Sequence, residues 1–179
     1  MKKILGILFL FTSLWVNSQN YLPTDDGSKL HFVIKNFGIN TGGDFTGLKG
    51  KIIFDARNIS KCFFDVTVAV KTIDTDNGKR DEHLKKEEYF DVATYPVIHL
   101  VSTKIEPGAD LKNFIFKGNL TIKNVTKPIS FPFTAEAKGS GALFVGSFEI
   151  NRVDFGVGKE SFSLSNKIKV TLTAFAKAQ

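Results

Sequence analysis

The stretch "KNFIFKGNLTI" (residues 112–122) alternates large apolar residues with polar ones, and so does "KPISFPFTAEA" (residues 127–137). Phe114 and Phe116 fall on one face of the first segment, and Phe131 and Phe133 fall on one face of the second. Successive side chains of a strand point to opposite faces, so a period of two is typical of a half-buried strand. The link between the segments is short, which favours antiparallel neighbours. Together they predict two long antiparallel strands that share an apolar face.

Similar segments recur along the rest of the chain. Six more strands are predicted, at residues 29–37, 44–55, 62–72, 97–105, 142–150 and 167–177. Turn residues such as Pro107-Gly108 separate several of them, and no repeat or linker divides the chain. About eight long strands predict a single all-β domain, either an up-and-down barrel or a sandwich. A barrel of this strand number is just wide enough to be filled by side chains or to hold one small ligand.

The first nineteen residues have the pattern of an export signal. Lys2 and Lys3 precede an apolar run over residues 4–16, which is too short to span a bilayer, and small and polar residues follow it. This order is typical of a secretory signal peptide. We therefore expect a signal peptide over residues 1–19, a domain over residues 20–179, a periplasmic or secreted location, and no stable transmembrane segment after cleavage.

The charge of the chain indicates no nucleic-acid partner. The formal net charge is +6, and removal of Lys2 and Lys3 leaves 22 basic against 18 acidic residues, or +4. The basic residues are spread along the chain and form no stripe interleaved with aromatic residues. Cys62 is the single cysteine, so no intramolecular disulfide can form, and we expect it to be a small core residue.

Residues 77–96, "NGKRDEHLKKEEYFDVATYP", are the most charged part of the chain. Asn77 is a good N-cap, and acidic residues precede basic ones by four positions at Asp81–Lys85 and Glu82–Lys86. Leu84 is the only large apolar residue from Asn77 to Glu88. The pattern predicts a short surface helix between the third and fourth strands, anchored by Leu84 and the following aromatic pair, Tyr89-Phe90.

Sequence motifs for catalysis or metal binding are absent. His31, His83 and His99 lack the spacing of metal ligands, and no phosphate-binding or nucleophile motif occurs. We therefore predict no catalytic residue, no metal site and no cofactor. The alternative is an envelope enzyme that acts on a lipid-like substrate, with His83 and a nearby carboxylate as an acid–base pair.

The segment "INRVDFGVG" (residues 150–158) places an arginine where a strand ends in a glycine-containing loop. A buried arginine needs a partner, and we expect a carboxylate such as Asp154, Asp81 or Asp91 to pair with Arg152. Such a pair could tie the loop to the rim of the barrel, or Arg152 could bind the headgroup of a ligand.

Phenylalanine is unusually abundant. Sixteen of the 18 Phe residues lie after residue 19, many of them at alternating strand positions, with Gly118 and Gly146 beside them. These rings could line a long apolar cavity or interdigitate into a filled core. The residues alone favour neither possibility over the other.

Five segments, in this order and spacing, resemble the YceI-like family of exported polyisoprenoid-binding proteins. They are "SKLHFVIKNFG" (28–38), "GGDFTGLKGKIIFD" (42–55), "IDTDNGKRDEHLKKEEYFDVATYPVI" (73–98), "GNLTIKNVTKPI" (118–129) and "INRVDFGVG" (150–158). The resemblance covers residues 24–177. Two departures are small: Lys35-Asn36 stands where Lys-His is frequent in the family, and Asn124 stands where Gly is usual.

The resemblance implies an eight-stranded antiparallel, lipocalin-like barrel with a short helix between strands 3 and 4. Its interior would hold a long isoprenoid or similar lipid, such as an isoprenoid quinone, and the protein would be a non-enzymatic carrier or reservoir. A homodimer is also compatible with it. From the alternation, the expected lining is Leu30, Phe32, Ile34, Phe45, Val66, Val68, Phe114, Phe116, Phe131, Phe133 and Phe148. The expected mouth residues are Leu84, Tyr89 and Phe90. An error of one residue in register would exchange the two faces.

Overall fold

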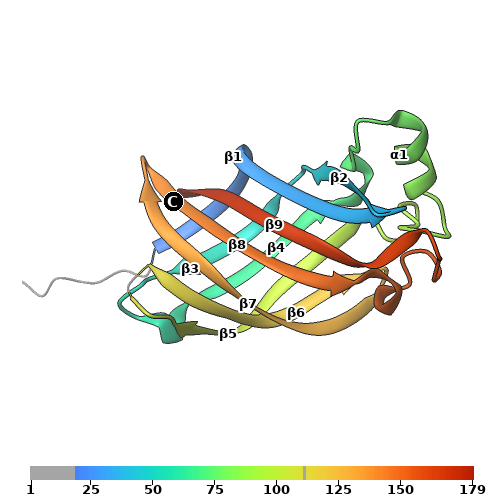
Figure 1. Cartoon of the computed structure of the whole chain (residues 1–179). Helices are drawn as coiled ribbons and strands as arrows, with labels where there is room; N and C mark the ends of the chain where they lie inside the picture. Colours follow the sequence, from blue (N-terminus) through green and yellow to red (C-terminus); the bar gives the residue numbers. More distant parts are fainter. Residues whose placement is uncertain (1–18, 111) are drawn as a thin grey trace, which may run out of the picture.

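The computed structural model describes residues 19–110 and 112–179, and Figure 1 shows long strands wound around a common axis. The strands are β1 (Gln19–Asn36), β2 (Ile39–Phe45), β3 (Lys49–Phe54), β4 (Phe63–Ala69), β5 (Val97–Pro107), β6 (Asn113–Ile122), β7 (Val125–Lys138), β8 (Gly141–Asn151) and β9 (Leu164–Ala178). The helices are α1 (Gly78–Leu84) and three short 3-10 turns, η1 (Ile59–Lys61), η2 (Val70–Thr72) and η3 (Arg152–Phe155). The predicted signal peptide lies outside the described residues, except for Gln19 at the start of β1.

The strands form one antiparallel sheet that closes on itself. Their order is β2-β1-β3-β4-β5-β6-β7-β8-β9, and β1 also pairs with β9. Eight strands therefore make a closed barrel, and β2 is an additional strand that extends it at one end. This confirms the predicted all-β, eight-stranded antiparallel barrel and excludes the sandwich.

The predicted strand at residues 44–55 is in fact two strands. β1 is 18 residues long, and one of its edges pairs with β3 near its start and with β2 near its end. Gly47 interrupts the pairing because it has a left-handed backbone (φ 75°) and packs closely against Ala69. The carboxylate of Asp25 holds this bend by accepting hydrogen bonds from the Gly47 and Leu48 amides, both at 2.9 Å. Beyond its pairing with β1, β2 has a single bridge, between Asp44 and Asp74.

Two hairpins use two-residue turns in which both residues are left-handed. In the β6–β7 turn, Lys123 and Asn124 have φ values of 49° and 63°. Asparagine tolerates this conformation, so Asn124 fits the turn. In the β1–β2 turn, Phe37 and Gly38 have φ values of 48° and 78°.

The predicted short helix is confirmed, between the third and fourth strands of the closed barrel, β4 and β5. The Asn77 side chain caps it by accepting a hydrogen bond from the Arg80 amide at 3.1 Å. The predicted pairs Asp81–Lys85 and Glu82–Lys86 are wrong. Asp81 is buried and accepts hydrogen bonds from the Thr75 amide, at 2.9 Å, and hydroxyl, whereas Lys85 pairs with Glu82 at 2.9 Å. Burial thus gives Asp81 a partner that sequence spacing does not reveal.

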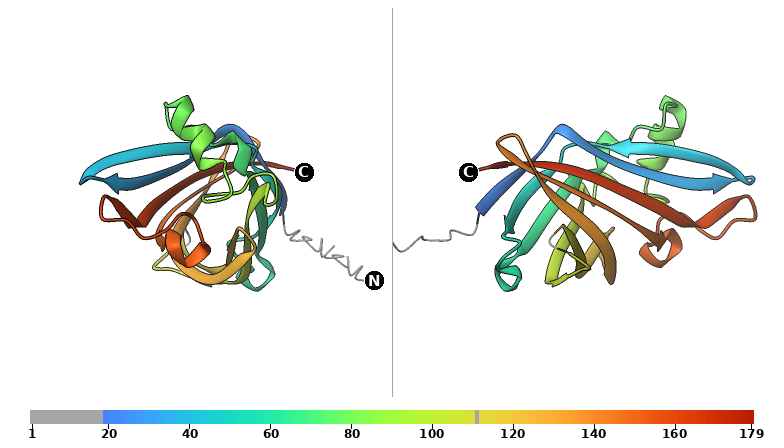
Figure 2. Two further views of the ribbon diagram at one scale, coloured as in Figure 1. Left: turned by 90° about the vertical axis from the view of Figure 1, so that its right-hand side faces the viewer. Right: turned by 60° about the vertical axis from the view of Figure 1, so that its left-hand side comes forward.

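The two ends of the barrel differ. We call the end that carries α1, the β1–β2 turn and residues 159–163 the open end, and the opposite end, where the C terminus lies, the closed end (Figures 1 and 2). A cluster of buried aromatic residues fills the closed end: Tyr21, Phe54, Phe64, Phe114, Phe116, Phe131, Phe133 and Phe144. A smaller cluster, which includes Phe90, Leu120, Ile122 and Phe155, lies toward the open end.

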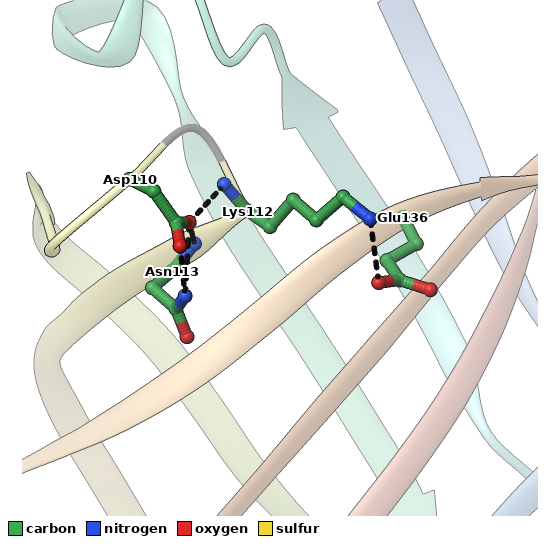
Figure 3. Close-up of polar contacts among 4 residues, drawn as sticks. All are labelled: Asp110, Lys112, Asn113 and Glu136. Carbon is green, nitrogen blue, oxygen red and sulfur yellow. Dashed lines mark hydrogen bonds and ion pairs between the residues drawn. The ribbon is translucent and has the colours of Figure 1, made fainter.

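Polar contacts fasten the β5–β6 connection at the closed end (Figure 3). The Asp110 carboxylate accepts hydrogen bonds from the amides of Lys112 (2.8 Å) and Asn113 (3.0 Å) and from the Asn113 side chain (2.9 Å). The hydrogen bond from the Lys112 amide, together with those from Asn113, lowers the pKa of Asp110. Lys112 also reaches Glu136 on β7 at 3.4 Å. Both carboxylates of this group thus have partners, and the contacts stabilise the β5–β6 turn.

Candidate functional site

The barrel encloses a cavity of about 480 Å³ between the aromatic cluster and the open end. Its wall is formed mainly by the inward-facing apolar residues of the strands and by the segment that carries Leu84, Tyr89 and Phe90. Pockets for small ligands usually measure about 300–1,000 Å³. Of the two possibilities that the Phe content left open, the structure therefore has a cavity at the open end and a filled core at the closed end.

Thirteen of the fourteen predicted site residues line this cavity: Leu30, Phe32, Ile34, Phe45, Val66, Val68, Leu84, Tyr89, Phe90, Phe116, Phe131, Phe133 and Phe148. They come from β1, β2, β4, β6, β7 and β8 and from the α1 segment, so the closure of the barrel brings them together. That they contact a ligand remains a prediction.

Phe114 is the exception. Its side chain is 1% exposed and packs against Phe54 and Phe133 at ring-centroid distances of 5.1 and 5.4 Å. It faces inward as the alternation predicts, but it lies in the filled closed end, away from the cavity. Alternation identifies which face of a strand is inside, and it gives no information on the height of a residue along the barrel axis.

Further residues line the cavity. Some follow the same alternation within their strands as the predicted residues do: Phe64, Leu120, Ile122, Ile150, Ile168, Val170 and Leu172. Others were not predicted. Two lie outside the strands, and two lie in the strand at residues 97–105, for which no inward face was assigned: Leu48, Val157, Ile98 and Leu100.

Stacked aromatic rings form the floor of the cavity. Phe131 lies between Phe116 and Phe148, and both ring-centroid distances are 4.8 Å. Phe116 and Phe131 are buried, whereas Phe148 is only half-buried. Gly146 lies beside this stack, and a Cβ atom there would come within 3.0 Å of the Phe131 ring. The absence of a side chain at Gly146 thus makes room for the Phe131 ring, which lines the cavity.

The segment after α1 closes one side of the cavity. Phe90 is buried and meets Phe45 of β2 edge-on, with ring centroids 5.9 Å apart. Its amide donates to the carbonyl of Leu84 at 3.1 Å, which folds the segment back on the helix. The contacts of Phe90 are apolar, while the charged residues around it face water.

Arg152 is buried in the cavity wall at the open end, with 2% of its side chain exposed. The predicted carboxylate partner, Asp154, Asp81 or Asp91, is wrong. The guanidinium instead donates to the carbonyls of Ser165 (3.0 Å), Val157 (2.8 Å) and Lys159 (2.7 Å) and to the Asn166 side chain (3.1 Å). Val157 and Lys159 lie in the loop between η3 and β9, and Ser165 and Asn166 lie at the start of β9, so the arginine is surrounded by three backbone carbonyls and one side-chain amide.

The groups that accept hydrogen bonds from Arg152 are all uncharged. Burial lowers the pKa of Arg152, while the nearby Tyr89 and Glu160 act in the opposite direction. A guanidinium stays protonated in proteins, so the cavity wall carries a positive charge at this point. The contacts tie η3 to the start of β9, and a role in binding a ligand headgroup remains a prediction.

Histidine–carboxylate pairs lie outside the floor of the cavity. His31 meets Asp44 and His99 meets Asp65, each at 2.7 Å, and His83 meets Glu88 at 3.2 Å. All six side chains are partly exposed. Within residues 19–110 and 112–179, no group of three or more His, Cys, Asp or Glu residues is arranged to hold a metal ion.

Cys62 is half-buried beside the aromatic cluster. Burial raises the pKa of its thiol, and the hydrogen bond with the Asp55 backbone acts in the opposite direction. The raised pKa disfavours the thiolate, so Cys62 is poorly suited to nucleophilic chemistry.

A closed antiparallel barrel with an apolar interior cavity belongs to the class of up-and-down barrels that includes the lipocalins. The family model described as the YceI-like domain matches residues 22–176, and the chain belongs to this family.

Relatives cover nearly the whole chain. Protein YceI of Salmonella agona is 28% identical in an alignment that covers 96% of this chain and 95% of the relative. The crystal structure of Burkholderia cenocepacia BcnA matches with a TM-score of 0.78 and 24% identity, over 84% of this chain and 96% of BcnA. A polyisoprenoid binding domain from Saccharophagus degradans, implicated in plant cell wall breakdown, matches with a TM-score of 0.70 and 15% identity, over 91% and 100%. These structural likenesses show the fold.

No helix in the described part of the chain combines the length and apolar character needed to cross a membrane.

Proposed function

We propose that this protein binds a long apolar lipid, an isoprenoid or a similar molecule, inside its barrel. The observation that carries the proposal is the cavity of about 480 Å³, whose wall is built from the inward apolar faces of the strands. The family and the polyisoprenoid binding domain of Saccharophagus degradans support it.

The composition of the wall favours an apolar chain as the ligand. Each methylene moved from water into such a site contributes about 0.8 kcal/mol. A long chain therefore binds through its length and needs few polar contacts, so the protein tolerates different chain lengths. The polar groups that line the cavity, such as Arg152 and Tyr89, lie toward the open end, where a headgroup would be placed.

The wider role we infer is that of a non-enzymatic carrier or reservoir outside the cytoplasm. The leader-like residues 1–19 support export to the periplasm or beyond. Binding without chemistry is supported by a cavity floor made of phenylalanine rings, which offer no acid, base or nucleophile.

The direct test is to purify the protein from its native host without detergent and to analyse an organic extract by mass spectrometry. We expect one or a few isoprenoid-type lipids in a near-stoichiometric amount. A protein that is empty when isolated and also takes up no added isoprenoid quinone contradicts the proposal.

A variant that fills the cavity provides the matched comparison. Val170 lines the cavity, whereas its neighbour Thr171 faces the other side of β9. Val170→Phe should reduce the bound lipid at least severalfold while the protein stays folded. Thr171→Phe adds a ring of the same size outside and should leave the bound lipid unchanged. Equal lipid contents in the two variants would place the ligand elsewhere.

The enzymatic alternative retains one supporting observation. His83 borders the cavity, and its Nδ1 atom lies 3.2 Å from the Glu88 carboxylate. If this pair acts on a lipid-like substrate, His83→Ala will abolish conversion of the extracted lipid while leaving the bound amount unchanged. If the protein is a carrier, the bound lipid will be recovered chemically unaltered from both proteins.

A further inference from the structure

Three large apolar side chains project into solvent at the open end. The exposed fractions are 75% for Phe37, 71% for Ile39 and 106% for Phe162, the highest among the large hydrophobic residues of the described chain. Burying such side chains is favourable, so the high exposure of three of them at one end of the barrel requires an explanation.

These residues belong to two neighbouring turns. Phe37 and Ile39 flank Gly38 at the β1–β2 turn, and Phe162 lies in the loop before β9. The amide of Phe37 donates to the carbonyl of Ser163 at 2.6 Å, and Asn36 pairs with Leu164. In Figure 2 the hairpin and the loop lie at the same end of the barrel. We call Phe37, Ile39 and Phe162 the apolar tip.

The apolar tip borders the mouth of the cavity. The residues next to it in both turns line the cavity: Asn36, Thr41, Ser161, Ser163 and Leu164. The left-handed backbone of Phe37 (φ 48°) belongs to a tight two-residue turn, which holds the ring at the end of the hairpin. A flat surface that touched the tip would therefore also face the entrance to the cavity.

The charge around the tip is mainly positive. Lys35, Lys159 and Lys167 are exposed beside the two turns, and none of them joins an ion pair among the residues the structure describes. Glu160 is the acidic residue within the same loop. Unpaired lysines next to exposed aromatic and aliphatic side chains match a surface that is anionic outside and apolar beneath, which is the chemistry of a lipid bilayer with acidic headgroups.

We propose that the apolar tip inserts into the surface of an anionic lipid bilayer and brings the mouth of the cavity against that surface. Transfer of a lipid between bilayer and cavity rests on the proposed function above, whereas docking itself does not. The three side chains lie on two turns and none of them lines the cavity, which suits insertion between lipid headgroups better than recognition of a folded partner.

Docking can be measured by flotation with vesicles of phosphatidylethanolamine and phosphatidylglycerol (3:1), with phosphatidylcholine vesicles as the neutral comparison. We expect binding to the anionic vesicles that weakens as salt is added. Replacing the tip in the triple variant Phe37→Ser, Ile39→Ser, Phe162→Ser should lower the partition coefficient at least tenfold, because each apolar side chain contributes to insertion.

Phe63→Ser is the matched control. Phe63 is 38% exposed and starts β4, next to the buried Phe64 of the closed end. This variant should bind vesicles like the unaltered protein. Replacing Lys35 and Lys159 with Ser should reduce binding to anionic vesicles several-fold without affecting the weaker binding to neutral ones.

Lipid content separates this proposal from the previous one. The triple variant should still contain lipid by mass spectrometry, because its cavity is unchanged. A protein that docks but contains no lipid supports docking and contradicts the lipid-binding function. Unaltered vesicle binding by the triple variant overturns the docking proposal. So does a tip-dependent dimer in light scattering without vesicle binding, because the tip then contacts a second copy of the chain.

Discussion

The closed and open ends of the barrel are built from the same alternating strands, and yet one is solid and the other hollow. At the closed end, Phe54 packs edge-on against both Phe114 and Phe144, at ring-centroid distances of 5.1 and 5.3 Å. At the open end, the inward positions of β1 and β9 carry Ile34, Ile168 and Val170, all half-buried. Where aromatic rings from different strands lie at the same height along the barrel axis, they fill the interior. Where the inward side chains are shorter and aliphatic, a cavity remains.

The largest effect should come from removing a ring at the closed end. Phe114→Ala leaves a hole among rings that cannot relax into it, so it should lower the free energy of unfolding by about 3–5 kcal/mol. Phe148→Ala, in the half-buried wall of the cavity, should lower it by only about 1–2 kcal/mol. Urea unfolding of the two variants measures the difference.

The two variants should be ranked in the opposite order by ligand binding. Phe148→Ala should change the amount or type of bound lipid, whereas Phe114→Ala, if folded, should not. Equal losses of stability would show that the cavity wall is packed as tightly as the closed end, and the comparison between the ends would then fail.

Arg152 gives the next largest expected effect, and it tests how the hollow end holds its shape. Arg152→Ala removes the donor for several buried carbonyls and should lower the free energy of unfolding by about 2–3 kcal/mol. The amides of residues 156–166 should lose protection from hydrogen exchange before the rest of the barrel does.

The conservative variant separates charge from geometry at this site. Arg152→Lys keeps the positive charge but cannot reach carbonyls in several directions at once, so it should rescue little of the loss. If Arg152→Lys restored the full free energy of unfolding, the positive charge alone would be sufficient, and the several hydrogen bonds of the guanidinium would not be needed.

The smallest effect concerns the outer surface near the closed end. Lys104 and Lys117 each lie 2.8 Å from the Glu106 carboxylate and lower its pKa from 4.5 to about 2, Lys104 having the larger influence. Because the pKa is lower in the folded state, the stabilisation is present above pH 4.5 and is lost as the pH falls toward 2. The Glu106 side chain is half-buried and remains in contact with solvent, which screens the two ion pairs, so the effect on unfolding should be slight.

An NMR titration of the Glu106 carboxyl carbon measures this pKa directly. Lys104→Met should raise it part of the way back toward 4.5, and Lys117→Met should raise it by a smaller amount. A pKa near 4.5 in the unaltered protein would contradict the closeness of the two lysines.

Alternation of side chains was enough to predict the strands and their inward faces. Phe32, Val68 and Phe148 all lie where the period of two places them. The barrel itself became the preferred architecture through the order of the family segments, because a sandwich can be built from the same alternation. The helix at α1 was predictable because its cap, Asn77, and its length are local features.

The features that sequence reasoning missed depend on contacts between distant segments. Phe114 and Phe116 are equivalent in the pattern and both belong to the buried aromatic cluster, but only Phe116 also lines the cavity. Arg152 found its acceptors in the backbone, whose carbonyls carry no sequence signature. The break at Gly47 depends on Asp25 and Ala69, which are remote in sequence.

The single bridge between β2 and the segment before α1 has a mechanical consequence. β8 and β9 are joined by a ladder of 11 residue pairs, whereas β2 is held to Asp74 by two backbone hydrogen bonds, of 2.8 and 3.0 Å, at Asp44. Directly after β2, the Thr46 carbonyl accepts a hydrogen bond from the Ala69 amide at 3.3 Å, and Phe45 and Phe90 add a side-chain contact. The junction between β2 and the segment before α1 is therefore weakly hydrogen-bonded. A thermal fluctuation that separates these two segments breaks far fewer hydrogen bonds than one that separates β8 from β9.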